Sequence, residues 1–282
     1  MPRTLRPGQR SELYVVDVVS NEHRLVFSSD EVLFEAPNWL PDGTLVVNGN
    51  GLLYRVADGL EEIELGGVPA INNDHVVSPD GRTVYLSADD GHIHAVPIQG
   101  GPGRRVTNDR GPGFHHYLHG VSPDGATLAY IGLEWVGEQR ITNVWTIPAA
   151  GGADVQVTDD EFADDGAEFS PDGAWIYFNS ERAGQAQLFR IRLADGHVEQ
   201  LTDDERVNWF PHPAPDDSSI AYVSFPTGTQ GHPADIDDVR LRLLRRDGEV
   251  RELTSLFGGQ GTMNVPSWSP DSSSFAYVTY PI

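Results

Sequence analysis

Ser170-Pro171-Asp172-Gly173, followed at once by the β-rich stretch 175–179 (WIYFN), is the piece of sequence that decides the fold. Proline at the second turn position fixes φ, aspartate tolerates the third, and glycine closes the turn, so the phrase predicts a type I hairpin turn. Related phrases occur six times, at residues 40–43, 78–81, 122–125, 170–173, 214–217 and 269–272. The chain is therefore an internal repeat with a period of roughly 40–50 residues.

Each repeat contains enough β-forming sequence for four strands. One strand precedes the turn, a second follows it, and a third and fourth come before the next repeat, the fourth ending in phrases such as 156–158 (QVT) and 200–202 (QLT). Four antiparallel strands per repeat are typical of a propeller blade. The sequence thus predicts an all-β fold, a six-bladed β-propeller that forms a single domain over residues 1–282.

The sixth repeat is incomplete, because we expect only two strands after Pro270 before the chain ends at Ile282. Residues 12–18 and 24–27 alternate like strands but have no first and second strands of their own. We expect these N-terminal strands to pair with the C-terminal strands, which closes the ring and removes its open edges.

Composition restricts the classes of function. The chain has no cysteine, and its 19 basic residues, all arginine, face 42 acidic ones, for a net charge of −23. Such a field repels nucleic acid, and the acidity is interpreted as serving solubility. No apolar run is long enough for a membrane span or a signal peptide, so we expect a cytoplasmic protein that makes no membrane contact.

The repeat resembles that of TolB-type propellers, through the motif Pro-x-Trp-Ser-Pro-Asp-Gly at residues 37–43 and 266–271. A group of single-domain bacterial TolB-like proteins is more similar still, with Asn-Asp-His, Leu-His-Gly and Asn-Trp-Phe-Pro-His at residues 73–75, 118–120 and 208–212. The resemblance covers essentially the whole chain and implies the fold. It names no reaction, since such blades serve scaffolds, protease gates and sugar-degrading enzymes.

Candidate site residues precede the Pro-Asp turns, where a propeller topology gathers them at one mouth of the channel. His75 and His119 occupy the same place, three residues before Ser-Pro, in adjacent blades, and His212 lies one residue later in its own blade. We expect His75, His119, His212 and Arg140 to be catalytic. The predicted substrate-binding residues are Asn73, Asp74, Tyr117, Glu134, Asp165, Asn208, Trp209, His232 and Asn264. A single histidine of this kind is more often a hydrogen-bonded core residue, and the aromatic residues also suit blade packing.

Three imidazoles at one pore are a suitable ligand set for a divalent metal, because neutral imidazole is a common ligand of zinc and manganese. The expected ion is Mn, Zn or Ca. The predicted ligands are His75, His119, His212 and Gln260. In the placement of these residues at the channel, the chain resembles the oligogalacturonate lyases. These are seven-bladed TolB-like propellers in which a His and Gln cluster holds a metal beside an acidic sugar.

Two functions remain open from the sequence. The first is a carbohydrate-active enzyme, a lyase or hydrolase that acts on a small sugar or oxidised sugar at the His-rich mouth. The second is a non-catalytic propeller that binds a protein or peptide. The phased histidines favour the enzyme narrowly, because a scaffold needs no imidazole at equivalent places in neighbouring blades. No nucleotide-binding fingerprint or Gly-x-Ser-x-Gly motif is present.

Overall fold

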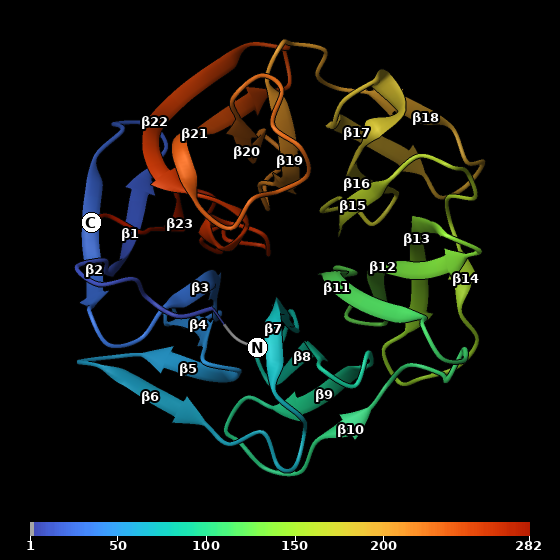
Figure 1. Ribbon diagram of the computed structural model, residues 1–282, viewed down its shortest axis with the longest axis horizontal. Helices are drawn as coiled ribbons and strands as arrows, with labels where there is room; N and C mark the ends of the chain where they lie inside the picture. The colour runs from blue at the N-terminus through green and yellow to red at the C-terminus, as the bar shows by residue number, and fades with distance from the viewer. Residues whose placement is uncertain (1–2) are drawn as a thin grey trace.

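A computed structural model describes residues 3–282 as a closed ring of six β-sheets around a central axis (Figure 1). In five sheets, four antiparallel strands follow one another from the axis outward. Blades 1 to 3 comprise β3 (Phe34–Trp39), β4 (Leu45–Gly49), β5 (Leu52–Val56) and β6 (Leu60–Ile63); β7 (Ile71–Val77), β8 (Thr83–Ala88), β9 (Ile93–Pro97) and β10 (Arg104–Arg105); and β11 (His115–Val121), β12 (Thr127–Val136), β13 (Gln139–Pro148) and β14 (Val155–Gln156). Blades 4 and 5 comprise β15 (Asp164–Phe169), β16 (Trp175–Ser180), β17 (Gln187–Arg192) and β18 (Val198–Gln200); and β19 (Val207–Pro213), β20 (Ser219–Phe225), β21 (Ile236–Arg245) and β22 (Val250–Gly258). The predicted six-bladed propeller is confirmed.

The sixth blade joins the two ends of the chain. Its sheet has the order β2-β1-β23, with β1 at Ser11–Asp17, β2 at His23–Ser29 and β23 at Ser274–Thr279. Leu13 lies opposite Val278, and Val16 lies opposite Phe275. The predicted closure is confirmed, but only one strand follows Pro270, and the innermost strand is reduced to a single bridge between Trp268 and Phe275.

The innermost strand of blade 6 is incomplete because the chain before it runs into the channel. The 3-10 helix Gln260–Thr262 contacts β3, and Met263, Asn264 and Val265 are fully buried. The carbonyls of Met263 and Asn264 accept hydrogen bonds from histidines of blades 5 and 3. Residues 260–265 therefore fill the middle of the ring; we call them the plug.

The six repeated turns form as predicted. In each, the fourth residue donates its backbone N–H to the carbonyl of the first, at 2.8 to 3.0 Å. The fourth residue has φ between +59° and +86°, which glycine adopts without strain and which Asp217 and Ser272 adopt in the two repeats that lack glycine. Gly81 also packs closely, since a Cβ there would lie 2.7 Å from Cδ of Pro41 in the preceding blade's turn.

The core consists of apolar layers between neighbouring blades. Side chains such as Leu53 and Leu86 fill the seam between blades 1 and 2, and Leu13 and Phe34 fill the seam between blades 6 and 1. One small cluster between blades 4 and 5 has Leu188, Tyr222 and Leu244 as its buried members. These layers hold the inner strands rigidly around the axis.

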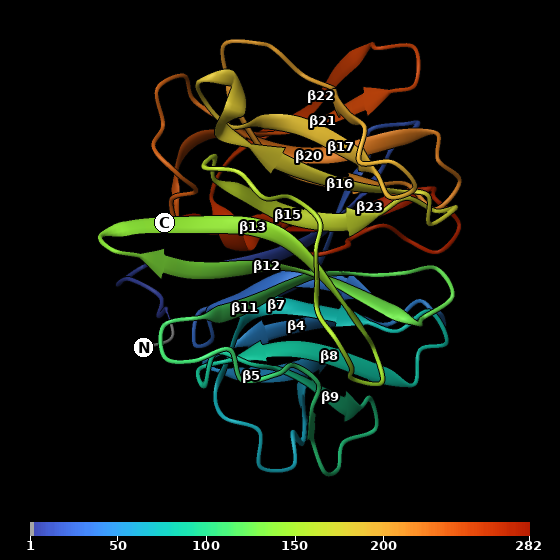
Figure 2. The ribbon, with the colours of Figure 1, turned by 90° about the vertical axis from the view of Figure 1, so that its right-hand side faces the viewer.

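The two mouths of the ring differ. The Pro-Asp turns surround one mouth, the turn mouth. The segments that lead into the innermost strands reach the opposite mouth, the loop mouth, as do the loops between second and third strands. Figure 2 shows the β12–β13 hairpin extending beyond the other strands on the side where the C-terminus lies. Within residues 3–282, no helix is long and apolar enough to cross a membrane.

Candidate binding site at the loop mouth

A pocket of about 230 Å³ opens at the loop mouth between blades 2, 3 and 4. It gathers seven of the residues predicted from the sequence together with Asn72, Ile131 and Thr142. The seven are Asp74, Tyr117, His119, Arg140, Asp165, His232 and Gln260. Half of the predicted site residues thus share one concavity, of a size that suits one side chain or a small ligand.

His119 lies at the floor of this pocket as a charged group. Its Nε2 lies 2.9 Å from Oδ1 of Asp165, and its Nδ1 lies 3.1 Å from the carbonyl oxygen of Asn264 in the plug. A carbonyl and a carboxylate only accept hydrogen bonds, so both ring nitrogens donate and the ring is an imidazolium. Burial lowers the pKa of His119, but the hydrogen bond to Asp165 and the charges of Asp74 and Asp165 outweigh burial and raise it to about 9.

Asp74 is the second acid of the pocket. Asn264 Nδ2 donates to its Oδ1 at 2.8 Å, and Asn72 Nδ2 donates to its Oδ2 at 2.6 Å. Burial raises the pKa of Asp74, against the opposing charge of His119. The neighbouring Tyr117 has its pKa raised by burial and then by Asp74, while Arg140 lowers it. Tyr117, Asp74 and Arg140 thus line the same pocket.

His232 completes the pocket from the long loop between β20 and β21. Its Nε2 lies 3.5 Å from Oδ2 of Asp165, and its ring meets Trp209 edge-on at 4.8 Å. Trp209 itself is buried in the core between blades 5 and 6. Trp209 was predicted to bind substrate, but it supports His232 instead of lining the pocket.

A second pocket of about 200 Å³ adjoins the first, with Asn72 and Gln260 lining both. The predicted Asn73 lines it, as do Arg3 and Glu35. Sequence reasoning missed Arg3, which precedes the first strand and belongs to no repeat. Glu35 occupies the same place before its turn as Asp165 and Asn264, and that shared position was a usable signal.

The rim beside the pockets carries exposed apolar side chains. At the tip of the β12–β13 hairpin, Trp135 is 57% exposed and Val136 58% exposed, and Phe162, 41% exposed, belongs to the segment that leads into β15. Glu134, predicted to bind substrate, lies on this hairpin opposite Ile141, outside the pocket lining.

Besides Trp209, Glu134 and the plug residue Asn264, three further predicted residues line neither pocket. His75 is fully buried, and neither ring nitrogen has a hydrogen-bond partner; burial lowers its pKa to about 3. Asn208 is buried at the seam of blades 4 and 5, where its Nδ2 donates to Gln187 at 2.9 Å. His212 lies below the plug, with Nδ1 2.5 Å from Glu168 and Nε2 donating to the carbonyl of Met263.

The predicted metal ligands do not form one set. The ring nitrogens of His119 and His212 point at oxygen acceptors, His75 is isolated in the core, and Gln260 lines the loop-mouth pockets. Among residues 3–282, no three His, Asp or Glu side chains are placed to hold a metal ion together. The side chains present therefore do not fit the predicted divalent ion.

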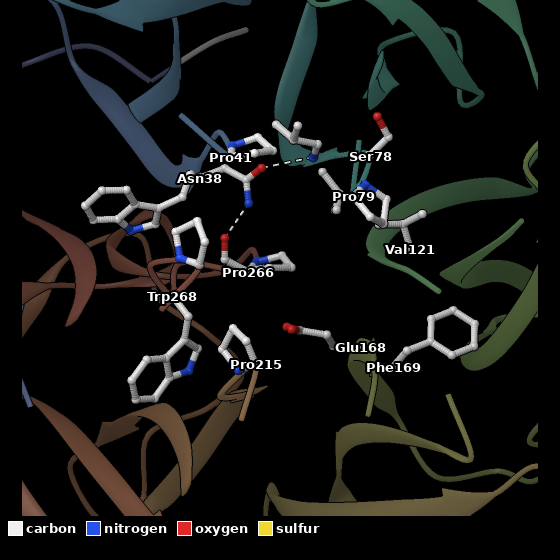
Figure 3. A pocket seen from close by; sticks show the side chains of 14 residues that line it. Asn38, Pro41, Ser78, Pro79, Val121, Glu168, Phe169, Pro215, Pro266 and Trp268 are labelled. Carbon is white, nitrogen blue, oxygen red and sulfur yellow. Dashed lines mark hydrogen bonds between the residues drawn. The ribbon is translucent and has the colours of Figure 1, made fainter. Parts of the chain in front are cut away.

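The turn mouth has a different character. It contains a pocket of about 350 Å³. Figure 3 shows Glu168 pointing into this pocket among turn prolines such as Pro41, Pro79 and Pro215. Burial raises the pKa of Glu168, against the opposing charge of His212. Glu168 is thus part of a blade-to-blade contact with His212.

Comparisons with known proteins agree with this architecture. Residues 120–244 match the model of the TolB beta propeller domain. An uncharacterised protein of Agrobacterium fabrum is 40% identical over 287 residues, covering 97% of this chain and 94% of the relative. A solved structure from Agrobacterium tumefaciens, provisionally assigned as TolB, is 39% identical, covers 97% of this chain and 99% of that one, and has a TM-score of 0.89.

A likeness to an oligogalacturonate lyase solved with manganese is limited to the fold. That structure is 13% identical, with a TM-score of 0.59 over 91% of this chain and 73% of that one. Such a distance carries over no catalytic or metal-binding residue. The repeats, the ring closure and the close relatives together place this chain in the family of TolB-type β-propeller proteins.

Proposed function

We propose that this protein is a non-catalytic binding module that takes a protein or peptide partner across its loop mouth. The observation that carries the proposal is the exposed pair Trp135 and Val136 on a hairpin that projects beside a polar pocket. Exposed aromatic side chains next to a concavity are typical anchors of protein interfaces.

The layout of the mouth suits a peptide. Two small adjoining pockets, divided by Asn72 and Gln260, offer places for two side chains of one bound segment. Arg140 at the rim and Asp74 at the floor give the first pocket both a donor and an acceptor side. A peptide could thus be held by apolar contact at the hairpin and by hydrogen bonds in the pockets.

The carbohydrate-active enzyme predicted from the sequence has less support. A general base needs a free lone pair, and both ring nitrogens of His119 donate to oxygen acceptors. His75 and His212, the other two predicted catalysts, do not line the pocket. The names of the relatives at 39% and 40% identity state no reaction.

The test uses a random peptide library displayed on phage and selected on the immobilised protein. Selected peptides should bind the Trp135→Ala and Val136→Ser variants at least tenfold more weakly, since anchor residues carry roughly 2 kcal/mol or more. Val155→Ser is the matched control, because Val155 is also 58% exposed but lies on the outer strand of the same blade. Equal affinity for all variants, or no enrichment, would refute the proposal.

A further inference from the structure

The second pocket at the loop mouth already holds a cation from the protein itself. The guanidinium of Arg3 forms an ion pair with the carboxylate of Glu35, and its Nη2 lies 3.4 Å from Oδ2 of Asp235. The same group lies 4.9 Å from the centre of the Tyr280 ring. Two carboxylates and one aromatic ring therefore surround one guanidinium.

This surrounding is built by the rigid ring. Glu35 is 7% exposed on β3, and Tyr280 is fully buried just after β23, with no hydrogen-bond partner for its hydroxyl. Gly261 of the plug packs so closely that a Cβ would collide with the Glu35 carboxylate and the Tyr280 hydroxyl. Burial raises the pKa of Glu35 even against the charge of Arg3, so a carboxylate here either takes up a proton or is stabilised by a cation, and Arg3 supplies that cation.

Arg3 is held in the fold less firmly than the residues that surround its guanidinium. Arg3 belongs to no strand or helix, and its side chain is 26% exposed. The neighbouring Leu5 packs on the core, and Gln9 donates to the carbonyl of Tyr280, so the segment has anchors other than the Arg3 side chain. Exchanging one guanidinium for another keeps every contact of Glu35 satisfied.

We propose that Glu35, Asp235 and Tyr280 form an arginine-binding subsite, which Arg3 fills in the free protein and an arginine of the peptide partner fills in the complex. This inference rests on the proposed function and names one side chain of its ligand. Arginine fits better than lysine, because a planar guanidinium pairs with carboxylates while it stacks on an aromatic ring. The net charge of −23 favours a basic segment as well.

Chemical complementation tests the subsite. Arg3→Ala should lower the melting temperature, and millimolar methylguanidinium should raise it again, with a smaller effect from methylammonium. The double variant Arg3→Ala/Glu35→Gln removes the buried charge, so methylguanidinium should not raise its melting temperature. The melting temperature of the wild type should not rise either. Arg6→Ala is the matched control, since Arg6 lies on the same segment but is half exposed and pairs with Asp235 and the Phe257 ring, not with Glu35 or Tyr280. No rescue of Arg3→Ala, or equal rescue of the double variant, would overturn the subsite.

Binding of the selected peptides gives the second readout. Arginine-containing peptides should bind Arg3→Ala at least tenfold more tightly than wild type, because their arginine no longer competes with Arg3. Loss of affinity at Trp135→Ala without guanidinium rescue would leave the binding function standing and refute the arginine subsite. Guanidinium rescue without any peptide affinity would refute the binding function and reduce the pocket to a structural contact of Arg3.

Discussion

Raising the pH from 6.5 to 10 should destabilise the protein, because His119 loses the proton that it holds in the fold. Burial lowers the pKa of His119, but the hydrogen bond to Asp165 and the two nearby carboxylates raise it to about 9, from an ordinary value of 6.5. The folded state thus keeps a proton that the unfolded chain releases between these values. The stabilisation is complete below pH 6.5 and is lost as the pH rises through 9.

The magnitude follows from the difference between the two pKa values. One pH unit corresponds to 1.36 kcal/mol, so the span from 6.5 to 9 is worth about 3 kcal/mol of unfolding free energy. The double variant His119→Gln/Asp165→Asn removes both partners of the ion pair and should lack this loss. His75 serves as an internal control, since burial lowers its pKa to about 3 and it stays neutral throughout this range.

Two measurements check the argument. Urea unfolding of wild type and the double variant at pH 6, 7, 8, 9 and 10 should give profiles that converge or cross as the pH rises. An NMR titration of the His119 ring should give a midpoint well above 7. Parallel unfolding profiles, or a midpoint at or below 6.5, would show that the hydrogen bonds to Asp165 and Asn264 have been misread.

Three further predictions concern the ring. Gly81→Ala should cost more stability than Gly43→Ala. Both glycines have positive φ, where an alanine costs roughly 1–2 kcal/mol, but only at Gly81 would the new Cβ meet a neighbouring proline. Thermal unfolding of the two variants isolates the contribution of that contact. Leu13→Ala should cost about 2–5 kcal/mol in urea unfolding, while Leu25→Ala, 48% exposed on β2, should cost little; equal effects would mean that β1 is not part of the cooperative ring. Asn208→Ala should lower the unfolding free energy by about 1–3 kcal/mol and leave peptide affinity unchanged, because Asn208 holds a blade seam. A loss of peptide affinity in this variant would instead mean that Asn208 belongs to the binding site.

The fold could be predicted because its signal is local. Proline, aspartate and glycine in four consecutive positions determine a turn through φ and one backbone hydrogen bond, and six phased turns leave few architectures. The incomplete blade 6 could not be predicted, because no pattern in the residues before Pro266 indicates that they enter the channel. Only burial of Met263 and Asn264 in the assembled ring reveals the plug.

The candidate site could be predicted in position but not in orientation. The register shifts within five innermost strands, at places that include Glu35/Asn38, Leu118/Gly120 and Trp209/His212. A bulge re-aims the following side chains, so counting residues from the turn does not say which of them face the pocket. His75 and His119 are equally far from their turns, yet the shift in β7 lies between Ile71 and His75, and only His119 reaches the pocket.

Bulges of this kind carry a weak sequence signal. Gly166 has φ of +67°, but Ala36 and Phe210 adopt φ of +54° and +55° at equivalent places without being glycine. Positive φ in alanine and phenylalanine is uncommon and is held by the surrounding structure. Neither residue indicates a bulge in the sequence, so the final direction of His212 came only from the structure.

Three buried acids around the channel each contact a basic side chain, and only one of these contacts is suited to exchanging that side chain for an arginine of a bound peptide. Asp165 pairs with His119 of the neighbouring blade, and Glu168 pairs with His212 of the blade on its other side. In both pairs the histidine belongs to an inner strand, so removing it would require the ring to open. Glu35 instead pairs with Arg3, whose segment lies outside every sheet. Of these three acids, Glu35 alone can change its partner while the propeller stays closed, and that places the arginine of a bound peptide at Glu35.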